Sequence, residues 1–162
     1  MCSSADGLFW IKHLAGDAKT CEFSHASSAV GRKSHRHGPG AHVIIIGGQG
    51  YSLMWPEGED IKRFDWKDGS VVVPPERWFH QHFNTGASPA RYLAIRWGSQ
   101  KYPRPWQMKS YGVDESVKKG GAQIEFEDED LKIRQMFEAE LAKHGLKSRM
   151  DYTKKERRAD FV

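Results

Sequence analysis

Four of the eight histidines in this chain of 162 residues fall into two closely spaced pairs. His35 and His37 form the first pair, and His80 and His82 form the second. Residues i and i+2 of an extended strand project from the same face of a sheet. If the faces that carry the two pairs meet, three or four imidazoles converge. Such a cluster is costly to bury as charge, but it is well suited to a divalent metal ion.

The segments around the two pairs predict β-strands. Short runs of apolar and β-branched residues alternate with turns rich in glycine, proline and aspartate, a pattern typical of an all-β barrel or sandwich. The expected strands, seven or eight in number, cover residues 8–14, 21–23, 41–46, 51–55, 61–66, 71–73, 78–83 and 91–97. The side chains of the histidine pairs would then face the interior of a closed sheet.

The character of the chain changes after the last expected strand. We expect a barrel over residues 1–100, followed over 101–162 by an irregular arm, one helix at about 127–144 and a basic tail. Ile133, Phe137 and Leu141 fall on one helical stripe, which predicts a helix that packs on the barrel or on a twin subunit. The four acidic residues 127–130 would occupy the first turn, where the helix dipole favours negative charge. Gly145 would end the helix.

Composition narrows the class of protein. Hydrophobic residues make up 38% of the chain and charged residues 28%, which is typical of a globular domain. The net charge of +4 is mild and the basic residues form no single stripe, so we expect no nucleic-acid partner. No run approaches the ~18 apolar residues of a membrane helix, so we expect a soluble, cytoplasmic protein with no membrane partner.

The stretch from His35 to Asn84 resembles the two conserved motifs of the cupin superfamily. The second motif is matched at its spacing by four residues, and Arg77 replaces its second glycine; the first motif is matched by both histidines of the first pair and by a closing glycine. The matching positions are Gly69, Pro75, His80 and Asn84 in the second motif, and His35, His37 and Gly48 in the first. The resemblance implies a double-stranded β-helix, or jelly-roll barrel, and a metal site. It also implies that Asn84 fixes a turn.

The first motif lacks two of its usual residues. Ala29 stands where the motif has a glycine, and the glutamate ligand is missing. Counting back from Gly48 puts Ala41 at the position of the glutamate, whereas counting forward from His37 with the longer spacer puts His42 there. One residue changes the face of a strand. The site therefore has either three histidine ligands or a fourth from His42.

Three histidines without a carboxylate are similar to the gentisate dioxygenase branch of the cupins. That resemblance implies Fe(II) held by His35, His37 and His80, with open positions for O2 and for a small anionic, oxygen-bearing substrate, either aromatic or aliphatic. Small cupins commonly pair, so a homodimer is expected. His82 shares a face with His80 and is a candidate catalytic base, a donor to the other groups of the site, or an alternative ligand.

Two other functions stay open from the sequence. One is a non-redox isomerase, lyase or cyclase that uses Zn, Ni or Mn as a Lewis acid, which a fourth ligand from His42 would favour. The other is a non-catalytic protein that binds a small molecule or a metal. Four aromatic side chains are candidates for the pocket wall, namely Tyr51, Trp78, Phe83 and Trp97.

Overall fold

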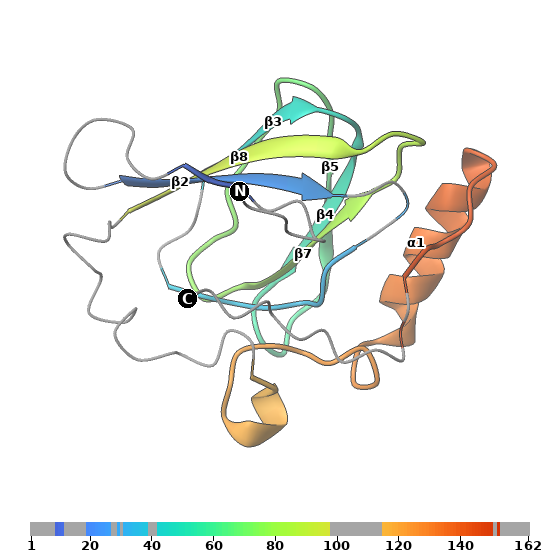
Figure 1. Ribbon diagram of the computed structural model, residues 1–162. Coiled ribbons are helices and arrows are strands. Elements are labelled where there is room, and N and C mark those ends of the chain that lie inside the picture. The colour runs from blue at the N-terminus through green and yellow to red at the C-terminus, as the bar shows by residue number, and fades with distance from the viewer. Residues whose placement is uncertain are drawn as a thin grey trace.

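The structure, a computed structural model, describes residues 9–11, 19–26, 29, 31–38, 42–97, 115–150 and 152. Within these ranges it is mostly β, with a helix near the C-terminal end (Figure 1). The elements are β1 (Phe9–Ile11), β2 (Lys19–Ala26), β3 (His42–Gly47), β4 (Gly50–Trp55), β5 (Lys62–Trp66), β6 (Val71–Val72), β7 (Phe79–Asn84), β8 (Ala90–Trp97), the 3-10 helix η2 (Val117–Lys119) and α1 (Leu131–Lys143). The predicted all-β class with a C-terminal helix is confirmed.

The strands form two antiparallel sheets that face each other. One sheet has the order β1-β2-β8-β3-β6 and the other the order β5-β4-β7. Apolar side chains from both sheets meet in an inner core, and they are Val43, Ile45, Met54, Trp66, Val72, Ala90, Tyr92 and Ala94. Residues of the two sheets that point toward this core therefore share one interior.

A second core lies on the outer face of the smaller sheet. Residues of β4 and β7 that point away from the interior pack against the stripe of α1, and Figure 1 shows this helix beside the two strands. This outer core contains Tyr51, Leu53, Trp55, Phe79, Phe83, Ile133, Phe137 and Leu141. The strands β4 and β7 are thus buried on both faces, and the predicted stripe of α1 is confirmed.

The start of α1 differs from the prediction. The helix begins at Leu131, and the side chain of Asp130 caps it by accepting a hydrogen bond from the Lys132 amide at 2.9 Å. The preceding acidic residues lie outside the helix, so the expectation of four carboxylates on its first turn is wrong. The predicted stop is confirmed, because Gly145 has a φ of 67° and the Leu146 amide bonds the Leu141 carbonyl at 3.0 Å.

The segment before α1 pairs with the loop that carries the first two histidines. The Ile124 amide donates to the Ser34 carbonyl at 2.8 Å, and the Arg36 amide donates to the Ala122 carbonyl at 3.0 Å. Buried Lys33 completes the contact with an ion pair to Glu125 at 2.6 Å. Residues 98–114, which include the first part of the predicted arm, and most of the basic tail lie outside the described residues. None of the helices that the structure describes combines the length and the apolar character needed to cross a membrane.

Candidate metal centre

Three imidazoles converge between the sheets. The ring centres of His35, His37 and His80 are 5.6, 4.5 and 4.7 Å apart, and one ligand nitrogen from each lies within 4.8 Å of the others. His80 is buried, whereas the other two are half-buried. The cluster is therefore set into the protein but keeps an accessible side.

Main-chain pairing brings the first histidine to the third. The amide of His35 bonds the carbonyl of His80 at 3.1 Å, and the amide of His80 bonds the carbonyl of His35 at 2.9 Å. In such an antiparallel pair the two side chains lie on the same face. His35 makes this isolated bridge without belonging to a strand, so the prediction of a strand around His35 and His37 is wrong, although the two rings still point to one place.

All three rings have the same tautomer. Their Nδ1 atoms lie 3.1 Å from main-chain carbonyl oxygens, those of Lys33 for His35, Gly38 for His37 and Trp78 for His80. A carbonyl can only accept, so each Nδ1 carries the proton and each neutral ring keeps a lone pair on Nε2. Fixing the tautomer through the other nitrogen is how proteins orient metal-ligating histidines.

The electrostatics of the cluster keep His35 uncharged. Burial lowers the pKa of His35 well below its usual value, and the neighbouring rings of His80 and His37 lower it further. Neutral imidazole is the form that binds a metal ion, so few protons compete with an ion for His35 near neutral pH.

The donor set fits a divalent transition metal. Nitrogens bound at about 2.1 Å to one ion lie roughly 3 Å apart, and one ligand nitrogen of each of the three histidines lies within 4.8 Å of the others. No carboxylate or thiolate of the described residues belongs to the group. Three neutral ligands would leave the charge of the ion uncompensated and part of its coordination sphere open.

His42 does not join the three clustered histidines. It opens β3 with an exposed side chain, opposite Ile95 of β8, and it is not part of the group of potential ligands. Ala41, the other residue at the position of the missing glutamate, lies outside the described residues.

His82 lies beside the cluster on the same face of β7. Its ring centre is 5.7 Å from that of His80 and 6.3 Å from that of Tyr92. Its Nδ1 lies 2.6 Å from the hydroxyl of Ser52, which in turn accepts a hydrogen bond from the Trp66 indole at 3.1 Å. Sequence reasoning missed Ser52 and Trp66. The available signal was a lone serine inside the apolar run from Tyr51 to Trp55.

Several residues of the motifs have structural tasks. Asn84 fixes the turn after β7, because its side chain accepts from the Gly86 amide and donates to the Ser88 carbonyl, both at 2.9 Å. Arg77, which replaces a motif glycine, has a φ of 63°, and its amide donates to the His37 carbonyl at 3.0 Å. The left-handed backbone explains why a glycine is usual at this position.

The four aromatic residues predicted to line the pocket do not all lie beside the histidines. Tyr51 and Phe83 stack on each other at 4.9 Å in the outer core against α1, on the face opposite the histidines. Trp78 is half-buried and packs against the inner core. The side chain of Trp97 lies outside the described residues.

Comparison with known proteins finds similarity only in structure: no family model and no curated protein matches the sequence. An oxalate decarboxylase structure superposes with a TM-score of 0.52 at 17% identity, over 60% of this chain and 27% of that chain. The capsular polysaccharide assembling protein CapF from Staphylococcus aureus superposes with a TM-score of 0.50 at 15% identity, over 59% of this chain and 29% of that chain. An RmlC-like cupin family protein from Methanocaldococcus jannaschii with a double-stranded β-helix fold superposes with a TM-score of 0.47 at 16% identity, over 62% of this chain and 89% of that chain.

These likenesses concern the fold. The two facing antiparallel sheets form the predicted jelly-roll barrel, which shares its fold with part of CapF and part of the oxalate decarboxylase, and α1 covers the outer face of the smaller sheet. The chain spans less than a third of the length of CapF and of the oxalate decarboxylase. The activities of those longer proteins are therefore not transferred with the fold.

Proposed function

We propose that this protein is a metal-dependent enzyme, a mononuclear Fe(II) dioxygenase that acts on a small anionic, oxygen-bearing substrate. His35, His37 and His80 would hold the ion through their Nε2 atoms. Fe(II) bound there would supply adjacent open positions at which the substrate and O2 can be brought together.

The observation that carries this proposal is that the Nδ1 atoms of all three imidazoles face carbonyl oxygens, while no carboxylate of the described residues belongs to the group. Among the residues that the structure describes, none with a negative charge belongs to the group of ligands. An anionic substrate that binds through two oxygens, such as a catecholate, a hydroxycarboxylate or an enolate, would provide it. The exposed position of His42 supports open coordination sites, because a fourth histidine would occupy one of them. One protein with a similar fold is an oxalate decarboxylase, whose name gives a small dicarboxylate as its substrate.

Metal analysis followed by oxygen uptake tests the proposal. Protein purified without added metal is analysed for its metal content, reconstituted with Fe(II) under anaerobic conditions, and mixed with catecholic, hydroxycarboxylic and enolic acids in an oxygen electrode. We expect one iron per chain and oxygen consumption with at least one substrate class. His37→Ala should abolish both, whereas the exposed His42→Ala, a matched control, should keep both.

Two results would contradict the dioxygenase. Retention of Zn, Ni or Mn together with turnover that consumes no oxygen would indicate a non-redox isomerase, lyase or cyclase. Tight metal binding without turnover of any tested anion would indicate a protein that binds a metal or a small molecule without catalysis.

A further inference from the structure

His82 makes a contact that distinguishes it from the three clustered histidines. Its Nδ1 faces the hydroxyl of Ser52, the residue directly opposite on β4, whereas the other three Nδ1 atoms face carbonyl oxygens. A carbonyl only accepts a hydrogen bond, but a hydroxyl can donate or accept. The tautomer of His82 therefore depends on where the hydroxyl proton of Ser52 goes.

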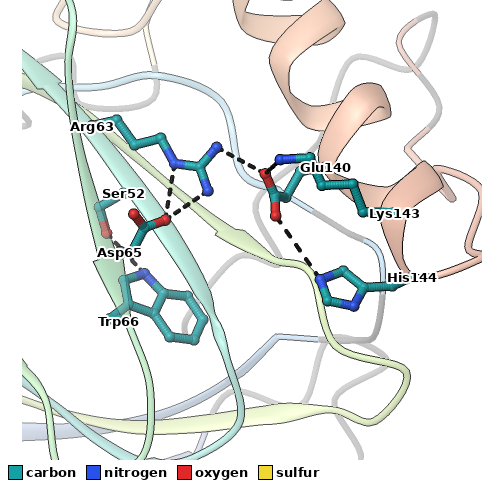
Figure 2. Close-up of polar contacts among 7 residues, drawn as sticks. All are labelled: Ser52, Arg63, Asp65, Trp66, Glu140, Lys143 and His144. Carbon is teal, nitrogen blue, oxygen red and sulfur yellow. Dashed lines mark hydrogen bonds and ion pairs between the residues drawn. The ribbon is translucent and has the colours of Figure 1, made fainter.

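Trp66 determines which group accepts the hydroxyl proton of Ser52. Its indole nitrogen is only a donor, and it lies 3.1 Å from the Ser52 oxygen, as Figure 2 shows. Ser52 is completely buried, so its own proton needs an acceptor inside the protein. Two groups of the described residues form hydrogen bonds with its oxygen, and of these the indole cannot accept whereas Nδ1 of His82 can. The Ser52 hydroxyl therefore donates to Nδ1, and neutral His82 carries its proton on Nε2.

We infer that the chain of hydrogen bonds Trp66–Ser52–His82 makes His82 a hydrogen-bond donor to the anion bound at the metal, and not a fourth metal ligand. An Nε2 that carries a proton has no lone pair to give to an ion. The ring lies on the interior face of β7 with its centre 5.7 Å from that of His80, so a ligand of the ion comes within its reach. Ser52 and Trp66 are positioning residues.

This inference rests on the proposed function and narrows its substrate class. The anion must present an oxygen that can accept a hydrogen bond beside the atoms that bind the metal, as a carboxylate or a catecholate does. A hydrogen bond from His82 to a charged oxygen then adds to the attraction of the ion.

Nitrogen NMR tests the tautomer directly. Two-bond ¹⁵N–¹H correlation spectra distinguish Nδ1–H from Nε2–H, and they can be recorded at pH 8 with histidine-labelled protein, metal-free and zinc-loaded. We expect His82 as the Nε2–H form in both. Ser52→Ala and Trp66→Phe should each shift His82 toward a mixture of tautomers. Ser34→Ala, which removes an equally buried hydroxyl outside this chain of hydrogen bonds, should leave it unchanged.

The wild-type spectrum alone can overturn the inference, which protects the test if a variant does not fold. An Nδ1–H form of His82 in the wild-type protein would contradict it. So would an unmixed Nε2–H form in folded Ser52→Ala, because Ser52 would then not set the tautomer. Zinc binding to Nε2 of His82 would contradict the exclusion of a fourth ligand.

Anion affinity tests the donor role. Oxalate is titrated into cobalt-loaded protein while the visible absorption of Co(II) is followed. An amide of Gln places its N–H near Nε2 of the histidine it replaces, whereas an amide of Asn places it near Nδ1. We expect His82→Asn to raise the dissociation constant by about tenfold or more, the effect of losing one charge-assisted hydrogen bond, and His82→Gln to stay within about threefold.

The two failures are distinguishable. If the protein binds no metal, the proposed function fails while the NMR result still decides the tautomer. If cobalt binds but His82→Asn holds oxalate as tightly as the wild-type protein does, the donor role is wrong and the metal site stands.

Discussion

The two faces of β7 are both covered, but they carry different kinds of residue. Toward the interior the strand presents His80 and His82. Their Nδ1 atoms are hydrogen-bonded to the Trp78 carbonyl and to the Ser52 hydroxyl, respectively. Toward α1 it presents Phe79, Gln81 and Phe83, all buried in or beside an apolar core. Alternate residues of one strand thus serve either a site or the stability of the fold.

This difference indicates how the fold compensates for the free-energy cost of burying the histidines. Burying imidazoles away from water is costly for their charged form, and burial is the largest cause of the lowered pKa of His35. The outer face offsets that cost, because α1 buries Ile133, Phe137 and Leu141 against the same strand. Changes on the outer face should therefore affect stability, and changes on the inner face should affect metal binding.

The largest expected effect is on the outer face. Phe137 is fully buried with its ring 4.7 Å from that of Phe83, so Phe137→Ala should lower the free energy of unfolding by about 3–5 kcal/mol. Urea unfolding measures this. The zinc affinity of the variant in the absence of urea should stay within about threefold of wild type. A parallel loss of affinity would show that the two faces are coupled.

The next effect is on the inner face. His80→Ala removes one of three ligands and should weaken zinc binding by about 100-fold or more, beyond the effect of losing a group that only orients a ligand. The matched control is the neighbouring residue on the other face, Gln81→Met, which keeps the volume and removes an amide that contacts Ser34 and Glu129 and belongs to the other face of the strand. Zinc titration should show nearly unchanged affinity for this control. Full zinc affinity in His80→Ala would contradict the metal centre.

The carboxyl of Glu129 should make the stability of the protein depend on pH. Burial raises the pKa of Glu129 to about 7, although hydrogen bonds from Ser34 and Gln81 lower it. The folded protein therefore binds this proton more tightly than the unfolded chain, and the contribution of Glu129 to stability falls as pH rises from about 4.5 to about 7. Glu129→Gln should stabilise the protein by about 2 kcal/mol at pH 8 and lose that advantage near pH 4.5.

The difference between variant and wild type, measured by urea unfolding of metal-free protein at several pH values, isolates this carboxyl from the histidines. An advantage of Glu129→Gln that did not change with pH would indicate that the pKa of Glu129 is the same in the folded and unfolded states.

The smallest effect concerns the ion pairs that join α1 to the sheet. Arg63 of β5 lies 4.1 Å above the Tyr51 ring. Figure 2 shows that it also bonds Glu140 of α1, at 3.0 Å, and Asp65. Because the pair is partly exposed, Arg63→Met, which keeps the aliphatic stem, should cost at most about 1 kcal/mol. The cost should shrink in 1 M salt in thermal unfolding. A loss as large as that of Phe137→Ala would mean that charge, not apolar packing, holds the helix.

Local sequence patterns were sufficient to predict the features that depend only on residues close together along the chain. Alternation and turn residues placed the strands to within a few residues, the stripe ending at Leu141 identified the helix, and the His-x-His spacing identified the ligand candidates. The tautomer of His82 could not be read this way, because it depends on β4 pairing with β7 in a register that puts Ser52 opposite His82. The exclusion of His42 likewise depends on the exact start of β3.

The main-chain pairing between the loop of the first two histidines and the residues before α1 has a consequence for how this chain can be divided. Ser34 and Arg36, which flank the first ligand, are hydrogen-bonded to residues 122 and 124. A recombination breakpoint between the barrel and the C-terminal region would strip these partners from the loop. The unit that gene fusion or transplantation can move intact therefore extends at least through this segment, and it does not end with β8.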